Sequence, residues 1–334
     1  MSRPTAQSTK RFIANPYFIL FVSVIAFSFA AILVRQSMNA GIQPIMISAG
    51  RLLISALVLT PLVWTRYRSQ LLNVRRITLI GAILAGMFQG VHFISIAFSL
   101  EYTSVVMNQA IISTSPIFIA LLEVFILKQR FTKWLYIGIA VTILGGILIA
   151  ISSGNSTTAI NPPLGNALAL LAGILASFYI FAGRVNRRHI SIMPYIWIVY
   201  LSGGITALIV AIVTGTQIFG YSADAYFWLA MTALVPQMIG HSSMNYVVGY
   251  IPATITTLAT QIIVLTSGIL AFILFQELPS GPEVLGITVT VTGVVMALIA
   301  QTWSGRKRKA KIIAAAGPIR EAGEIGIGRE DGLG

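Results

Sequence analysis

The chain has 334 residues, of which 56% are hydrophobic and only 9% are charged. Soluble domains carry about 25% charged residues, so this composition excludes a soluble globular protein and indicates helices embedded in a membrane. The formal net charge of +13 raises the alternative of a nucleic-acid-binding protein, which the positions of the charges can test. Cysteine is absent, which excludes disulfides and thiolate metal ligands.

Apolar runs separated by Gly, Pro and polar residues predict an all-α polytopic membrane protein with ten transmembrane helices. Each run is long enough to cross a hydrocarbon layer of about 30 Å at 1.5 Å per residue, and the alternating pattern of a β-barrel is absent. In chain order the expected spans are 17–37, 44–65, 78–99, 103–126, 133–153, 164–184, 193–214, 225–248, 253–275 and 282–303. A polar tail (1–16) precedes them, and a tail that is first basic and then disordered (304–334) follows.

The basic residues all gather on one side of these spans. If the N-terminus is inside, all of the 22 basic residues except Arg35 and Arg51 lie in inner loops, at the inner ends of spans or in the tails. This positive-inside pattern predicts both termini in the cytoplasm and an integral protein of a bacterial or archaeal plasma membrane. It argues against nucleic acid as a partner, and it makes membrane lipid the expected partner of the basic run 306–311.

The chain also repeats itself at an offset of about 148 residues. The recurring pairs include Gly138 and Gly286, Val141 and Val289, Thr142 and Thr290, and His92 and His241. Five helices in each half place the second half upside down in the membrane, which is the arrangement of inverted-repeat transporters. We therefore expect one five-helix half at 17–153 and another at 164–303, joined by an external linker at 154–163.

Three stretches resemble the EamA family of the drug/metabolite transporter superfamily. They are Ala49-Gly50-Arg51, Ser115-Pro116-Ile117-Phe118, and the stretch from Val235-Pro236-Gln237 through His241 to Asn245. The resemblance covers roughly residues 17–303 and implies two EamA-like repeats that form a secondary carrier exporting or exchanging metabolites by alternating access. The Gly-Glu pair that often follows the fourth and ninth helices of this family is missing here, so the resemblance does not transfer a substrate.

Polar residues inside the apolar spans predict where a small-molecule substrate binds. Arg51 lies about 10 Å from the outer end of its helix, where a charge costs at least about 2–3 kcal/mol. It is either an anchor for a carboxylate or phosphate, or a side chain that reaches the interface or a neighbouring helix. His92 and His241 lie on polar stripes and either line a cavity or bond between helices. The expected substrate-binding residues are Arg51, Gln89, His92, Asn108, Gln109, Tyr179, Tyr200, Gln237, His241, Asn245 and Gln261.

Three further features bear on movement and assembly. Pro116 and Pro236 predict kinks in the fourth and eighth helices. The glycine-bearing faces of the fifth and tenth helices either pack together or form the seam of a homodimer. Glu123, near the cytoplasmic end of its span, is either a proton-coupling group or one half of an interfacial ion pair.

A membrane-embedded enzyme and a channel are the alternatives to a transporter. An enzyme needs clustered acids, a metal constellation or a nucleophile with a base. His241 and Ser242 are no such pair, because neighbours on a helix point about 100° apart. A channel needs a filter-like loop. We therefore expect a transporter with no catalytic residues, metal or cofactor, moving a small polar metabolite such as an amino acid or a small organic anion.

Overall fold

The computed structural model describes residues 15–126, 128, 132–152, 160–187, 189–247, 263, 266–276 and 279–316, and its regular elements are all helices. In the first half these are α1 (Pro16–Ser28), α2 (Ala30–Asn39), α3 (Pro44–Arg66), α4 (Arg68–Leu72), α5 (Arg76–Tyr102), α6 (Val105–Ile112), α7 (Ser115–Phe125) and α8 (Lys133–Ser152). In the second half they are α9 (Pro162–Asn186), α10 (Ile192–Val213), α11 (Ala223–Thr232), η2 (Ala233–His241), α12 (Ser242–Val247), a helix at Thr266–Phe275 and α14 (Gly281–Ala316).

Several of these helices have the length and apolarity of membrane spans. Within the described residues, six stretches qualify, namely Pro16–Asn39, Pro44–Arg66, Arg76–Tyr102, Val105–Leu122, Pro162–Asn186 and Ile192–Val213. Shorter apolar helices cover Lys133–Leu148, Thr266–Phe275 and Val284–Ala297. Large apolar side chains such as Leu57 and Ile77 face outwards with 71% and 76% exposure, whereas polar Gln89 and Gln237 are fully buried. Apolar surface outside and polar groups inside suit a bundle surrounded by lipid.

Side-chain caps set where the helices begin. The Oδ1 atom of Asn15 accepts from the N–H of Tyr17 at 3.0 Å, and that of Asn161 accepts from the N–H of Leu164 at 3.3 Å. Each cap is followed by a proline as an early helical residue, where its missing N–H costs nothing. These signals explain why α1 and α9 start within two residues of the positions expected from hydropathy.

Both expected proline kinks coincide with irregular helix. The fourth span breaks at Ser113 and Thr114, just before Pro116, into α6 and α7. Around Pro236 the eighth span winds instead as the nine-residue π-helix η2, because proline lacks the N–H that an α-helical turn needs. Its carbonyls take partners from other helices: the Ser23 hydroxyl donates to Gly240 O at 2.9 Å, and the Ser55 hydroxyl donates to Ala233 O at 3.2 Å.

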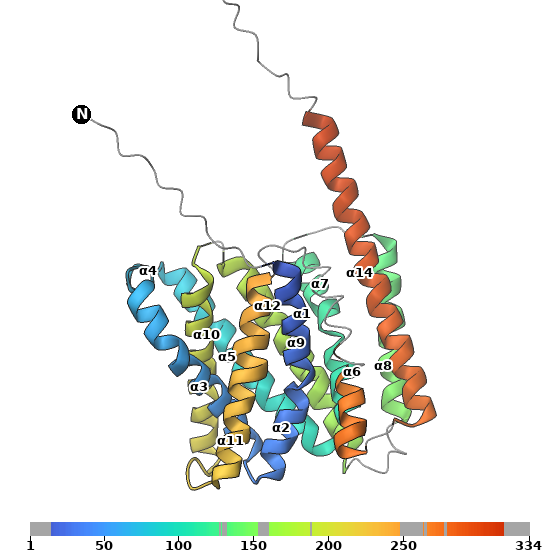
Figure 1. Cartoon of the computed structure of the whole chain (residues 1–334). Coiled ribbons are helices and arrows are strands. Elements are labelled where there is room, and N and C mark those ends of the chain that lie inside the picture. The colour runs from blue at the N-terminus through green and yellow to red at the C-terminus, as the bar shows by residue number, and fades with distance from the viewer. Residues whose placement is uncertain are drawn as a thin grey trace, which may run out of the picture.

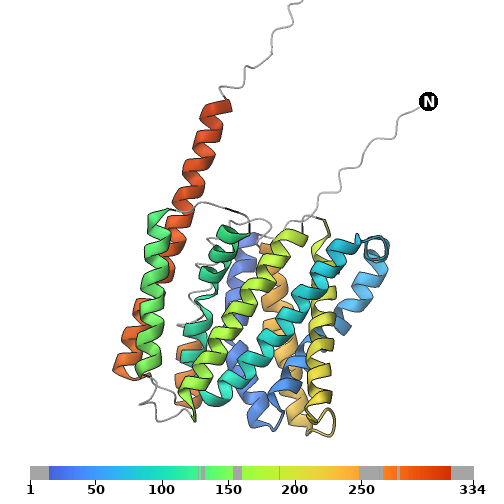
Figure 2. The same ribbon diagram turned by 180° about the vertical axis from the view of Figure 1, so that it is seen from behind.

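The helices form one bundle whose two ends differ in charge. The start of α1, the helix α4 and the end of α14 lie at the same end of the bundle (Figure 1). The basic residues of 66–76 and 306–311 therefore belong to this end, which we call the basic end. α14 continues to Ala316, well past the expected span end at 303, so the basic run is helical and projects beyond the bundle (Figures 1 and 2).

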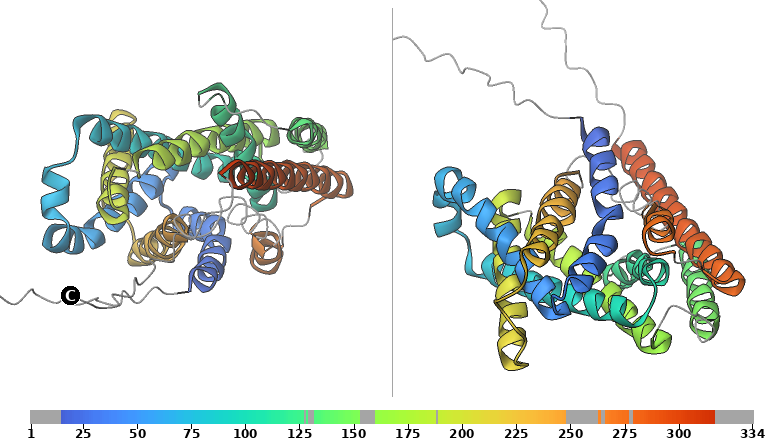
Figure 3. Two further views of the ribbon diagram at one scale, coloured as in Figure 1. Left: turned by 90° about the horizontal axis from the view of Figure 1, so that it is seen from above. Right: turned by 60° about the horizontal axis from the view of Figure 1, so that its bottom comes forward.

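Helices α8 and α14 lie side by side at one edge of the bundle (Figures 2 and 3). A Cβ atom added to Gly138 would lie 2.5 Å from the backbone nitrogen of Ala297, and one added to Gly145 would lie 2.4 Å from that of Thr290. The glycines therefore allow direct backbone contact between α8 and α14. Of the two arrangements expected for these faces, the structure shows packing within one chain.

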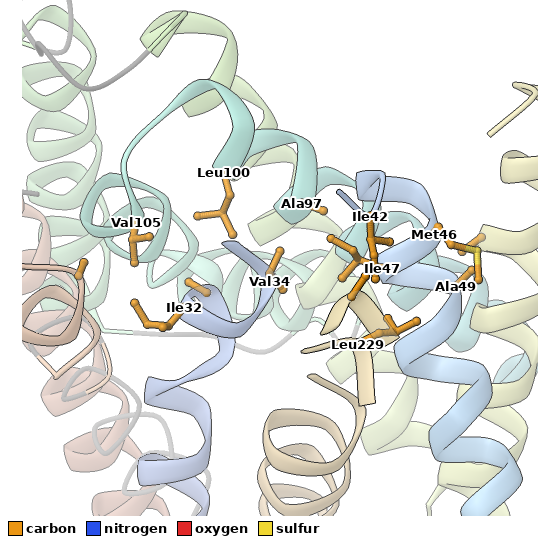
Figure 4. Close-up of a cluster of buried hydrophobic side chains, with 14 of the residues drawn as sticks. Ile32, Val34, Ile42, Met46, Ile47, Ala49, Ala97, Leu100, Val105 and Leu229 are labelled. Atoms are coloured by element: carbon orange, nitrogen blue, oxygen red, sulfur yellow. The ribbon is translucent and has the colours of Figure 1, made fainter. Parts of the chain in front are cut away.

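A buried apolar cluster (Figure 4) includes residues of α2 and α11, which lie at the end of the bundle opposite the basic end (Figure 1). Ile32 of α2, Ile47 of α3, Leu100 of α5 and Leu229 of α11 are among its members, so it joins both halves of the chain. We call it the apolar plug. It adjoins the turn of α3 that carries Arg51.

Candidate functional site

The polar residues expected to bind substrate meet around the ring of Phe93 on α5. The guanidinium carbon of Arg51, from α3, lies 3.9 Å from the centre of this ring. The imidazole rings of His92 and His241 lie 4.9 and 5.5 Å from it, the second edge-on, and Phe27 of α1 contacts His241 at 4.5 Å. One aromatic ring thus brings together a cation and two histidines from three helices of both halves.

The helices that meet at this ring carry buried polar atoms without partners. Arg51 is 2% exposed, and its Nε and Nη2 atoms have no hydrogen-bond partner. Gln89, one turn before Phe93, and Gln237, on η2 four residues before His241, have neither amide atom bonded. An unpaired buried donor or acceptor costs about 1–3 kcal/mol, so a folded protein rarely keeps several together unless a ligand or water completes them. We call Arg51, Gln89, His92, Phe93, Gln237 and His241 the Arg51 cluster.

Among the side chains that the structure describes, none of the acidic ones forms an ion pair with Arg51. The sequences of α1, α3, η2, α9, α10 and α12 contain no Asp or Glu, and neither does 248–276. The one acid on α5, Glu101, lies about 13 Å along the helix from His92. The side chain of Glu123 lies outside the part of the chain that the structure describes. A buried guanidinium without a counter-charge is costly, and an anion is the natural group to complete it.

The two histidines differ in their surroundings. His92 Nδ1 lies 2.7 Å from the carbonyl oxygen of Ala172 on α9. A carbonyl can only accept, so Nδ1 carries the proton and the Nε2 atom of the neutral ring is an acceptor. His241 has ring contacts with Phe27 and Phe93. Arg51 and both imidazoles contact the same ring, that of Phe93. The cluster therefore combines a cation with an acceptor nitrogen.

A close crossing of α5 and α10 positions one side of the cluster. A Cβ atom added to Gly90 would lie 2.5 Å from the carbonyl oxygen of Gly203, so only glycine permits this approach. The crossing brings the buried Tyr200 towards η2 and α12, where its hydroxyl lies 3.3 Å from Ser242 Oγ. The Tyr200 hydroxyl is also near the Gln237 amide, although no hydrogen bond of normal length joins them.

Asn245 extends the polar network by one helical turn. Its Nδ2 atom donates to the hydroxyl of Tyr179 on α9 at 3.1 Å and to the carbonyl oxygen of His241 at 2.8 Å. Tyr179 is buried. Asn245 and Tyr179 therefore lie next to the Arg51 cluster, as the sequence led us to expect.

Two expected site residues belong to a different network. Asn108 Nδ2 donates to the Ser99 hydroxyl at 2.8 Å, and that hydroxyl donates to Gly165 O at 2.7 Å. Gln109 donates to Asn108 at 3.3 Å. Because Ser99 lies two turns of α5 beyond His92, these contacts join α5, α6 and α9 away from the Arg51 cluster. A further expected residue, Gln261, lies outside the described residues.

The structure also adds residues that the sequence did not single out. Phe93 and Phe27 have no polar group and sit in apolar runs, so nothing in the pattern separates them from lipid-facing aromatics. The nearest signal is that Phe93 follows His92 directly. The helices that carry the Arg51 cluster are α3, α5 and η2.

The family model of the EamA-like transporter family matches the chain twice, at residues 15–151 and 163–299. The chain belongs to this EamA-like transporter family. Its membership confirms the resemblance to the drug/metabolite transporter superfamily and identifies an integral membrane protein of a transporter family. Members of this family are generally not enzymes.

Individual relatives agree with this assignment. The uncharacterized transporter YdfC of Bacillus subtilis (strain 168) is 28% identical over 187 residues, which are 55% of this chain and 59% of YdfC. The match thus spans less than two thirds of YdfC. The uncharacterized transporter YetK of the same organism is 23% identical over 223 residues, 65% of this chain and 67% of YetK. A crystal structure of a protein with 16% identity has a similar fold, with a TM-score of 0.60 over 86% of this chain and 98% of the other.

Proposed function

We propose that this EamA-like protein is a secondary transporter for a small polar metabolite that carries an anionic group, such as an amino acid or a small organic anion. The Arg51 cluster binds the substrate near the middle of the membrane. Arg51 pairs with the carboxylate, the Gln89 and Gln237 amides bond its polar groups, and His92 Nε2 accepts from an N–H or O–H of the same molecule.

The observation that carries this proposal is the unpaired guanidinium of Arg51. It is buried, and α1, α3, η2, α9, α10 and α12 contain no Asp or Glu. The amide atoms of two further buried side chains, Gln89 and Gln237, are also unpaired. An anionic metabolite with further polar groups supplies the missing charge and the missing hydrogen bonds together. An uncharged substrate would leave the charge uncompensated.

Alternating access supplies the movement. Ten spans in two inverted five-helix repeats, with both termini in the cytoplasm of a bacterial or archaeal cell, agree with the doubled family match, the recurring residues and the single basic end. The halves rock about the cluster, which contains residues of both. η2 and the break between α6 and α7 supply helices able to bend, because irregular turns hold fewer α-helical bonds.

Thermal stabilisation in detergent against a metabolite panel tests the binding role. The panel pairs each amino acid or small carboxylate with its primary amide, which lacks the carboxylate charge. A ligand at a hundredfold excess over its Kd stabilises the native state by about 2.7 kcal/mol. We expect carboxylates to raise the melting temperature and their amides to do so much less.

The same panel is repeated on a His92→Ala/His241→Ala double variant and on a matched control. The third histidine of the chain, His189, is exposed after α9, so His189→Ala is that control. Loss of the carboxylate response in the double variant alone supports the site. A response that survives in the double variant removes both histidines from it. Exchange of the bound compound across liposomes then tests transport.

A further inference from the structure

A line of polar groups leads from the Arg51 cluster to the basic end along one face of α9. Tyr179, Gly183 and Arg187 are spaced four residues apart and therefore share this face. Tyr195, near the start of α10, lies across it, because a Cβ atom added to Gly183 would be 3.0 Å from the Tyr195 hydroxyl oxygen. A larger side chain at Gly183 would crowd this hydroxyl.

Packing explains why the ring of Tyr195 is buried, but it does not explain why the ring carries an unpaired hydroxyl. Tyr195 is 0% exposed, and its hydroxyl has no hydrogen-bond partner. A buried phenol usually finds one, since leaving it unpaired costs about 1–3 kcal/mol. Packing of the apolar ring does not require the oxygen.

Arg187 places a cation on the same face of α9, one turn beyond Gly183. It follows the last residue of α9 and is partly buried. Burial lowers the pKa of the Arg187 guanidinium from its ordinary value, because water solvates it poorly there. α9 and α10 carry no acid that could neutralise it.

The line is continuous with the Arg51 cluster. Asn245 donates both to the Tyr179 hydroxyl and to the carbonyl oxygen of His241. In the other direction along α3, the apolar plug begins at Ala49, two residues before Arg51. In the described part of the chain, polar groups therefore continue from the cluster towards the basic end.

We infer that Tyr195 and Arg187 form a second anion-binding station, which takes the carboxylate of the substrate as it passes between the Arg51 cluster and the basic end. The hydroxyl donates one hydrogen bond to the carboxylate, and the guanidinium supplies charge-assisted bonds at the mouth of the pathway. This inference rests on the proposed function, because it needs an anionic substrate.

Thiol labelling tests the station without knowledge of the substrate, since the natural chain has no cysteine. A Tyr195→Cys variant in inside-out vesicles is treated with an impermeant anionic methanethiosulfonate and, separately, with its cationic trimethylammonium analogue. We expect the anionic reagent to react at least about tenfold faster relative to each reagent's rate with a free thiol. Adding Arg187→Gln should bring this preference close to one. Ala207→Cys, on the same helix within the apolar plug, should remain unlabelled from this side.

A second labelling position is needed in case the Tyr195→Cys variant does not fold. Asn245→Cys changes less volume and lies deeper on the same line, so Arg187→Gln should slow its anionic labelling as well. No labelling at either position, or labelling without anion preference, would overturn the station. If that occurs while Arg51→Gln still abolishes carboxylate-specific stabilisation, the station alone fails. If Arg51→Gln leaves carboxylate binding unchanged, the proposed function fails.

Discussion

Replacing Arg51 by Gln separates an anion anchor from a structural arginine. Gln keeps hydrogen-bonding capacity but removes the charge above Phe93. If Arg51 binds the substrate carboxylate, the variant should lose affinity for carboxylates and keep most of its affinity for the corresponding amides, which lack that carboxylate. If Arg51 is a structural donor, both ligand classes should suffer alike.

The structure sets the size of the expected loss. Two unpaired guanidinium nitrogens, Nε and Nη2, are available to a carboxylate. A hydrogen bond to a charged group contributes about 1.5–3 kcal/mol net, and 1.4 kcal/mol corresponds to a tenfold change in Kd. We therefore expect carboxylates to bind roughly 10–150-fold more weakly, and the amides to change by less than about threefold. Arg51→Lys should fall between, because it keeps the charge and loses the two-pronged geometry.

The ligand-free protein provides a second readout. Gln at position 51 removes a cation–π contact of about 0.5–2 kcal/mol, but it also removes an unpaired buried charge whose desolvation costs several kcal/mol. The melting temperature without ligand should therefore stay level or rise. Melting curves and isothermal titration of carboxylate and amide pairs give both quantities. A lower melting temperature together with equal losses for both ligand classes would refute the anchor role.

Three further variants test the packing around the site. Gly203→Ala places a methyl group 2.6 Å from the carbonyl oxygen of Gly86 and should cost about 1–3 kcal/mol, seen as a lower melting temperature; an unchanged value would contradict the close crossing of α5 and α10. His92→Phe removes the bond to Ala172 and should cost about 1 kcal/mol of stability as well as carboxylate affinity; unchanged affinity would place His92 outside the site. Pro236→Ala restores a backbone N–H and lets η2 rewind as an α-helix, so we expect slower substrate exchange across liposomes with undiminished stability. An unchanged exchange rate would show that the π-helix has no part in transport.

Much of the fold could be predicted because hydropathy and caps act locally. The spans that begin at Pro16, Pro44 and Pro162 needed only an apolar run and a starting signal. The apolar run of the last expected span ends at 303, whereas the helix α14 continues through the basic run to Ala316. Hydropathy indicates whether lipid or water surrounds a helix, whereas the backbone hydrogen bonds determine where the helix ends.

The site was predictable only as far as polarity marks it. Arg51, Gln89, His92, Gln237 and His241 stand out because polar groups are costly in lipid, and the structure gathers them. Polarity could not show that Asn108 lies outside the Arg51 cluster, where it bonds to Ser99. The sequence of one helix does not reveal which neighbouring helix its polar face contacts. Phe93 could not be found at all, since its role as a shared platform depends on how three helices meet.

Access to the site from both sides of the membrane is the most direct test of the account. Ser242→Cys changes one atom next to Tyr200, in a chain with no other thiol. Labelling by an impermeant thiol reagent is measured in right-side-out and inside-out vesicles, with and without the best carboxylate of the panel. Alternating access predicts labelling from both sides and protection by the carboxylate on each. Labelling from one side alone, unaffected by ligand, would contradict a substrate site that faces each side in turn.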